Sequence, residues 1–300
     1  MPYPPRLSAA DFDPEVLRLF DQYVHGTIDR RGFLAGAARF AVGGAGAAGL
    51  LAALSPQFAA AQQVKPDDAR LATRRVEFAS PHGYGKARGY LVRPTSAMGA
   101  LPVVLVVHEN RGLNPHIRDI ARRLAVAGFT AAAVDMLYPQ GGTPADEDKA
   151  REMFSRVDRS AAVRDLAAVV DWMKARPDSN GKVGVVGFCW GGAMANLLAT
   201  ASPALVAAVP FYGSAPPTSD VAKIRAKLLI HYAGNDPRIN ASWPDYDAAL
   251  KAANVDHRAF FYEGTEHGFN NDTAGARYNA AAADLAWKRT LAFFEANLTT

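Results

Sequence analysis

The chain contains a single cysteine, Cys189, among its 300 residues, so it cannot form an intramolecular disulfide. The scarcity of cysteine leaves the compartment open, because an exported protein can also fold without disulfides. Positive charge is also thinly distributed: the net charge is +4, with no block of about five or six basic residues. The composition therefore gives little support for a nucleic-acid-binding surface.

Internal repeats, low-complexity tracts and interdomain linkers are absent after residue 61. With 49% hydrophobic and 10% aromatic residues, the remaining chain can bury a full core. A charged fraction of 21% excludes wholesale disorder. We expect residues 62–300 to form one α/β domain.

The N-terminal part resembles a twin-arginine export signal. Arg30-Arg31 is followed by Phe33-Leu34, a tract rich in Ala and Gly, and an A-x-A site that ends at Ala61. The resemblance implies the twin-arginine export machinery as a partner and a periplasmic or secreted protein after cleavage near Ala61. An uncleaved membrane anchor and a cytoplasmic extension remain alternatives. Residues 1–28 have an acidic amphipathic pattern to which the sequence assigns no role.

Beyond the leader, strand-like and helix-like segments alternate. Residues 73–79 and 88–93 flank turn-forming residues and predict a hairpin. Further strands are expected at 103–108, 130–134, 183–186, 205–212, 227–232 and 258–262, and helices at 115–127, 160–175, from 190, 243–253 and 280–297. This alternation predicts a mostly parallel central sheet with helices on both faces.

Cys189 lies in the sequence GFCWG, residues 187–191, which has the spacing G-x-C-x-G between a strand and a helix. The same spacing with serine forms the nucleophile elbow of hydrolases. A side chain at such a turn is exposed above the sheet, near backbone N–H groups and the positive end of the following helix. Such a position lowers the pKa of a thiol and favours the reactive thiolate. The alternative is that Cys189 is a small buried packing residue.

Two later loops supply the partners that a nucleophile needs. Asp236 follows the strand expected at 227–232, and His267 follows the strand expected at 258–262. The chain order nucleophile, acid, histidine is that of the α/β-hydrolase fold. We therefore expect a Cys189–Asp236–His267 triad, with an oxyanion hole formed by the backbone N–H groups of Trp190 and Asn110.

These residues resemble those of the dienelactone hydrolase family over residues 76–298. The matching pieces are HENRGLN at 108–114, GFCWGG at 187–192, GNDP at 234–237 and HGF at 267–269. The resemblance implies an α/β-hydrolase fold, a cysteine nucleophile and a small ester or lactone substrate. It also implies that Glu109 contacts the thiol and helps to govern its ionisation.

The chain departs from the family at two positions that hold a substrate carboxylate. The corresponding stretches read MLYPQG at 136–141 and HGFNN at 267–271, without arginine. Arg111 and Arg277 are the candidate replacements. Tyr138, Trp190 and Phe269 are candidates for an aromatic pocket wall, or equally for packing. The departures predict a preference for neutral esters or lactones.

Together these features predict a hydrolase that cleaves a small ester or lactone through a thioester on Cys189. A cysteine-dependent thioesterase or peptidase, or a non-catalytic binding protein on a hydrolase scaffold, are the alternatives. No cofactor and no metal are expected, because the histidines lack local ligand spacing such as H-E-x-x-H. We expect no nucleic-acid partner, and a monomer or small homo-oligomer.

Overall fold

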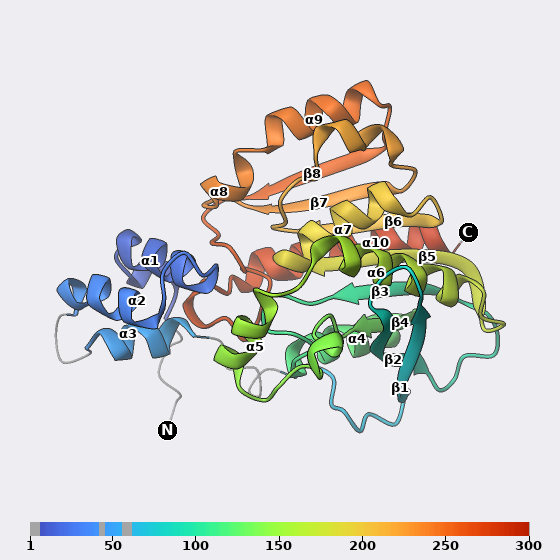
Figure 1. The fold of residues 1–300 in the computed structure, drawn as a ribbon, viewed down its shortest axis with the longest axis horizontal. Coiled ribbons are helices and arrows are strands. Elements are labelled where there is room, and N and C mark those ends of the chain that lie inside the picture. Colours follow the sequence, from blue (N-terminus) through green and yellow to red (C-terminus); the bar gives the residue numbers. More distant parts are fainter. Residues whose placement is uncertain (1–6, 42–45, 56–61, 300) are drawn as a thin grey trace.

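The computed structural model describes residues 7–41, 46–55 and 62–299. An eight-stranded sheet in the order β1-β2-β4-β3-β5-β6-β7-β8 forms its centre (Figure 1). The strands are β1 (Leu71–Ser80), β2 (Gly85–Pro94), β3 (Leu101–Val107), β4 (Thr130–Val134), β5 (Ser179–Phe188), β6 (Leu205–Phe211), β7 (Lys227–Ala233) and β8 (His257–Tyr262). β1 and β2 pair antiparallel, β2 joins β4 antiparallel, and the pairs from β4 to β8 are parallel.

Helices cover both faces of this sheet. Residues 62–299 contain α4 (Pro115–Val126), α5 (Glu147–Phe154), α6 (Arg159–Lys174), α7 (Trp190–Ala201), α8 (Pro237–Asn240), α9 (Trp243–Ala252) and α10 (Ala280–Leu298). Helices α4 and α10 pack on one face, and α6, α7 and α9 pack on the other. The mostly parallel sheet with helices on both faces confirms the predicted α/β-hydrolase architecture.

Local sequence explains where these elements begin and end. The apolar run of β3 is almost completely buried, and its side chains alternate between the two cores. Helix α4 begins after Asn114, whose side chain accepts from the N–H of Ile117, and Pro115 occupies its first position. The predicted hairpin is also present, as β1 and β2.

Helix α5 was not predicted. Its sequence is mostly polar, and only Ala150 and Phe154 are buried. Two apolar side chains one turn apart give too weak a periodic pattern to identify a helix from sequence. The helix begins after Asp146, which accepts from the N–H of Lys149, and its residues Arg151 and Phe154 line a cavity that Cys189 also lines.

Residues before β1 form a helical unit of their own. It consists of α1 (Pro14–Val24), α2 (Arg30–Ala37) and α3 (Ala47–Leu54), which pack around Phe20, Phe33 and Leu54. Figure 1 shows this unit, in blue, beside the edge of the sheet where the parallel strands end. Its core includes Ala276, which lies between β8 and α10, so the helical unit shares one apolar cluster with the rest of the described chain.

The Arg30-Arg31 pair begins α2, and the side chain of Asp29 caps that helix by accepting from the N–H of Gly32. The predicted cleavage point near Ala61 lies outside the described residues. No described helix is both long and apolar enough to cross a membrane.

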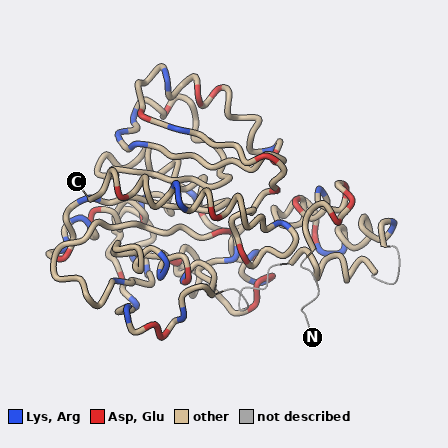
Figure 2. The backbone as a smooth tube through the Cα atoms, turned by 180° about the vertical axis from the view of Figure 1, so that it is seen from behind, with Lys and Arg blue, Asp and Glu red and all other residues tan. Residues whose placement is uncertain are grey.

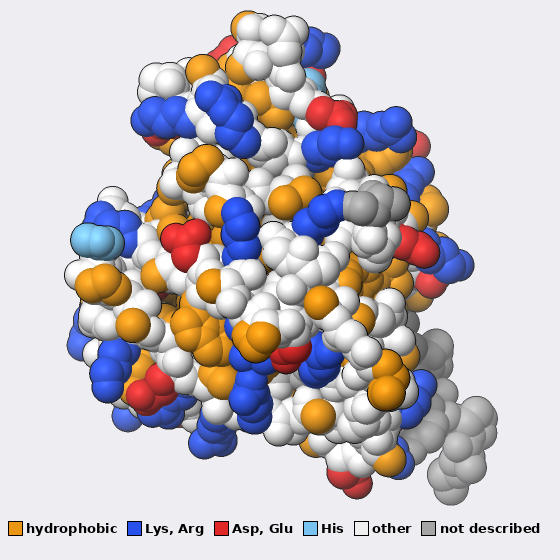
Figure 3. Space-filling view, turned by 90° about the vertical axis from the view of Figure 1, so that its right-hand side faces the viewer, with side chains coloured by type: hydrophobic (Ala, Val, Ile, Leu, Met, Phe, Trp, Pro, Cys, Tyr) orange, Lys and Arg blue, Asp and Glu red, His pale blue; other side chains and the backbone are white. Residues whose placement is uncertain are grey.

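Charged side chains are dispersed over the fold. Figure 2 shows Lys and Arg interspersed with Asp and Glu along the backbone. Figure 3 shows the face opposite the helical unit, where Lys and Arg side chains are scattered among apolar and uncharged groups. The thin charge distribution seen in the sequence therefore persists in three dimensions.

Candidate active site

Cys189 lies at a strained turn between β5 and α7. Its backbone has φ 56° and ψ −114°, a conformation that a non-glycine residue rarely adopts. A Cβ atom on Gly187 would lie 1.9 Å from the carbonyl oxygen of Gly191, and one on Gly191 would lie 2.2 Å from that of Val107. The two glycines of the motif are therefore required by close backbone contact.

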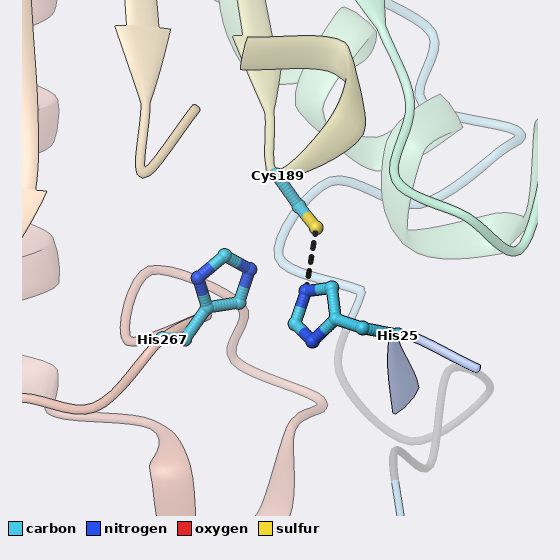
Figure 4. Close-up of side chains that lie close together, drawn as sticks. All are labelled: His25, Cys189 and His267. Carbon is cyan, nitrogen blue, oxygen red and sulfur yellow. Dashed lines mark hydrogen bonds between the residues drawn. The ribbon is translucent and has the colours of Figure 1, made fainter. Parts of the chain in front are cut away.

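Asp236 and His267 are held together at the ends of neighbouring strands. Nδ1 of His267 lies 2.5 Å from Oδ2 of Asp236, and both side chains are buried. The second ring nitrogen of His267, Nε2, makes no hydrogen bond with the described residues. Figure 4 shows a nitrogen of this ring on the side that faces the sulfur of Cys189. The acid thus fixes the histidine tautomer that can accept a proton from the thiol.

The electrostatics of the pair favour a thiolate beside an imidazolium. Burial by itself raises the pKa of the Cys189 thiol, but the positive charge of His267 and a hydrogen bond with His25 lower it to about 6. Burial lowers the pKa of His267, whereas the thiolate charge and the hydrogen bond to Asp236 raise it to about 10. Each group therefore stabilises the charged form of the other.

The oxyanion donors expected from sequence border the same space. Trp190 is the first residue of α7, so its N–H has no acceptor within the helix. Its ring stacks on His108 and contacts Phe154 edge to face. Asn110 lines the cavity, and its side-chain Nδ2 donates to the carbonyl oxygen of Val24 at 2.6 Å. The helical unit therefore fixes the loop that carries Asn110.

Glu109 lines a small cavity that Cys189 and His267 also line. Its carboxylate accepts from Nδ2 of Asn271 at 2.8 Å and from the hydroxyl of Tyr212 at 3.4 Å. These two donors hold the carboxylate of Glu109 in place.

Besides Trp190, the candidate substrate-binding residues separate into two groups. Arg111 and Arg277 line the small cavity beside Cys189, and Nη1 of Arg277 donates to the carbonyl oxygen of His267 at 3.0 Å. The structure does not bring the other two to the cavity. The hydroxyl of Tyr138 donates to Oε1 of Glu77 at 2.6 Å, and Glu77 belongs to β1, the outermost strand of the sheet. Phe269 is fully buried among aromatic rings, so it serves packing.

His25 is a site residue that the sequence did not reveal. It follows α1, and its Nε2 lies 3.7 Å from Sγ of Cys189, the contact drawn in Figure 4. Its Nδ1 donates to the carbonyl oxygen of Asp21 at 2.8 Å and lies 3.1 Å from Oδ1 of the same residue. Two Asp–His pairs, one from each part of the chain, therefore converge on one sulfur.

A local signal for this second pair was present in the sequence. Asp21 and His25 are four positions apart, a spacing that places both on one side of a helix. Burial lowers the pKa of His25, but the hydrogen bonds to Asp21 and Cys189 raise it. Only the packing of the helical unit against residues 62–299 reveals that this ring reaches the sulfur of Cys189.

A cavity of about 290 Å³ opens beside Cys189. Trp190, Phe154, Tyr212 and Ile239 supply apolar and aromatic walls, and Val24, His25 and Gly26 of the helical unit supply another. Arg151, Arg159 and Arg238 also line it, and the described lining residues include no Asp or Glu. The cavity is therefore suited to a small molecule and is bordered by three guanidinium groups, of which Arg151 pairs with Asp148 and Arg238 with Asp21, each at 3.6 Å.

The sheet, the nucleophile turn and the ordered acid and histidine define an α/β-hydrolase. The chain belongs to the dienelactone hydrolase family, whose model matches residues 87–298. Members of this family are ester and lactone hydrolases, and the chain is such an enzyme acting on a small-molecule substrate. A second family model, described as YqhI-like, matches residues 4–42, the segment that carries His25.

Similar proteins agree with this assignment. A Salmonella typhi protein named as a carboxymethylenebutenolidase is 36% identical over 220 residues, which cover 68% of this chain and 81% of that protein. A Klebsiella pneumoniae protein whose crystal structure is named as that of a dienelactone hydrolase is 31% identical in sequence. The two structures superpose with a TM-score of 0.64 over 74% of this chain and 98% of that one. The metagenomic dienelactone hydrolase-like promiscuous phosphotriesterase P91 is 26% identical with a TM-score of 0.67, covering 77% of this chain and 100% of that one.

Proposed function

We propose that this chain hydrolyses a small ester or lactone through a thioester intermediate on Cys189. The observation that carries the proposal is the position of the buried Asp236–His267 pair beside a thiol at a nucleophile turn. Unlike a buried packing cysteine, Cys189 lines an open cavity and has charged partners.

The steps follow from this arrangement. The Cys189 thiolate attacks the carbonyl carbon, and the oxyanion receives hydrogen bonds from the N–H groups of Trp190 and Asn110. The imidazolium of His267 donates its proton to the departing alkoxide, which leaves an acyl thioester on sulfur. His267 then removes a proton from water, the hydroxide attacks the thioester, and the thiolate is regenerated with release of the acid. Asp236 holds the imidazole in the required tautomer throughout.

The polarity of the cavity suggests that the substrate carries a carboxylate. The sequence predicts neutral substrates, because arginine is missing at two positions of the family pattern. Arg151, Arg159 and Arg238 come from other elements and line the cavity instead. This arrangement supports an anionic ester or lactone, in place of the neutral preference expected from sequence.

Trapping the intermediate tests the proposal directly. The purified full chain is mixed with an activated short-chain ester, quenched in acid and analysed by intact-mass spectrometry. We expect a mass increase of one acyl group in the wild type, located on Cys189 after digestion. Cys189→Ala should lose the adduct and about 10³-fold or more of the turnover, while its circular dichroism spectrum stays unchanged. Near wild-type esterase activity in folded Cys189→Ala would overturn the thioester mechanism.

A further inference from the structure

Three groups that bind transition metals meet at the nucleophile. Sγ of Cys189 and one ring nitrogen from each of His25 and His267 all lie within 4.8 Å of one another. A thiolate and two imidazoles are ligands that Zn²⁺ prefers. The three residues lie far apart in the sequence, so local ligand spacing could not have indicated the cluster.

The distances are close to those of a tetrahedral ion. Zinc bonds of about 2.3 Å to sulfur and 2.0–2.1 Å to nitrogen place tetrahedral S and N ligands about 3.6 Å apart. Sγ of Cys189 lies 3.7 Å from Nε2 of His25. His267 lies nearby with its ring centroid 4.8 Å from that of His25, so a small shift of one ring brings the third ligand into range.

Both histidines already have the orientation of metal ligands. A metal-binding imidazole usually donates its other N–H to a carboxylate or a backbone carbonyl, which fixes the tautomer. Nδ1 of His267 is bound to Asp236, and Nδ1 of His25 is bound to Asp21. The Nε2 atom of His267 is buried without a hydrogen-bond partner in the described structure.

We propose that His25, Cys189 and His267 form a binding site for a divalent transition metal such as Zn²⁺, which reversibly inhibits the enzyme. The ion accepts a lone pair from each of the three atoms, a water molecule completes the tetrahedron, and the proton carried by the imidazolium of His267 is released to solvent. The lone pair that attacks the substrate is then committed to the metal. Binding of the ion is independent of the proposed function, whereas the inhibition rests on it.

One residue opposes binding and sharpens the test. Nη2 of Arg238 lies 2.9 Å from Nε2 of His25, so it must move before the ion can take the lone pair of that nitrogen. Its side chain is 45% exposed and pairs with Asp21 at 3.6 Å, which leaves room for this movement. Removing Arg238 should therefore strengthen metal binding, the opposite of removing a ligand.

The site requires the helical unit. His25 belongs to residues 1–61, which the predicted export cleavage would remove. Metal inhibition through three protein ligands is therefore a property of the uncleaved chain.

Cobalt is the probe of choice, because Co²⁺ bound to a thiolate gives a charge-transfer band, and tetrahedral Co²⁺ absorbs strongly in the visible. Co²⁺ is titrated into the metal-free full chain, and Zn²⁺ affinity follows from competition. We expect one ion per chain, with both signals present in the wild type and the thiolate band absent from Cys189→Ala.

The variants separate this site from unspecific binding. His25→Ala should weaken binding by at least about 100-fold and Asp21→Asn by about 10- to 100-fold, whereas Arg238→Ala should tighten it on the order of tenfold. His82→Ala, at an exposed turn between β1 and β2, is the matched control and should bind as the wild type does.

Esterase activity of the same samples is measured with and without Zn²⁺, using His25→Gln as a second variant should His25→Ala fail to fold. Loss of activity should follow occupancy in the wild type and should require far more Zn²⁺ in either His25 variant. Unchanged Co²⁺ affinity in a folded His25 variant, or a spectrum without a thiolate band, would overturn the proposal and leave an adventitious ion only. Absence of esterase activity in metal-free wild type would instead count against the proposed function.

Discussion

Nε2 of His25 lies 3.7 Å from Sγ of Cys189, although 164 positions separate the two residues in the chain. The contact joins a helical unit that precedes the hydrolase part to the sulfur that we propose as the nucleophile. Because His25 is itself fixed by Asp21, the thiol has one Asp–His pair on each side.

Replacement of His25 should make the thiol less acidic. His25→Ala removes a hydrogen bond that lowers the pKa of Cys189, so alkylation by iodoacetamide at pH 6 should slow roughly two- to tenfold. Asp21→Asn should act in the same direction but less strongly. The rate is measured by intact mass, with His82→Ala as control, and an unchanged or faster rate in His25→Ala would contradict this role.

The pH dependence of alkylation reports the ionisation of Cys189 directly, since it is the only cysteine. The thiolate is the reactive form, so the rate should rise as the pH passes upward through about 6 and fall below it. His267→Ala removes the main positive charge beside the sulfur and should move the midpoint upward. The unfolded chain should show the ordinary value of about 8.5. A native midpoint equal to that of the unfolded chain would show that the pair is not formed.

Asp236→Asn should separate orientation from charge. The amide fits the same space, but it favours the wrong tautomer of His267, so kcat should fall by about 10⁴-fold with little change in KM. Steady-state kinetics on an activated ester measures the change, and the melting temperature checks the fold. A loss seen mainly in KM would assign Asp236 to substrate binding instead.

The arginines of the cavity predict substrate preference. Arg159→Ala and Arg238→Ala should each lower kcat/KM for an ester that carries a free carboxylate by about 10-fold, because a charge-assisted contact is lost. The corresponding neutral methyl ester should be affected far less. Arg258→Ala is a suitable control, because this exposed residue lies near the start of β8, at the opposite edge of the sheet. Equal losses on both substrates would show that these arginines do not bind the substrate carboxylate.

Export through the twin-arginine route stays a prediction of the sequence. Replacing Arg30 and Arg31 by lysine keeps their charge but removes the pair that the export receptor reads, so the full-length precursor should remain in the cytoplasm. Cell fractionation with intact-mass analysis measures both location and cleavage. Wild-type protein found in the cytoplasm with residues 1–61 attached would contradict export.

The nucleophile turn and the order of its partners were readable from sequence because each depends on local structure. A Gly-x-Cys-x-Gly turn needs only the strand before it and the helix after it. Asp236 and His267 directly follow strands, and in a parallel sheet the carboxyl ends of the strands meet at one edge. These positions therefore follow from element boundaries alone.

The positions of Tyr138 and Phe269 were not readable in this way. Both residues follow strands at the end of the sheet where the site lies. Packing decides the direction in which a loop side chain points. Tyr138 turns to Glu77 and lies under the guanidinium of Arg88, and Phe269 enters the aromatic core. In a sequence, an aromatic residue near a site is equally compatible with a place in the pocket wall and with a place in the hydrophobic core.

The sequence by itself determined the α/β sheet, the Cys189 turn and the positions of Asp236 and His267 after neighbouring strands, because hydrophobic periodicity, glycine spacing and chain order are local properties. Only the tertiary structure decided that α1 lies over the site, that His25 reaches the sulfur and that arginines from separate elements line one cavity. The amphipathic face of α1 shows that it packs against something, but not which surface it meets. That choice depends on shape and contact between segments distant in the chain, which no local pattern encodes.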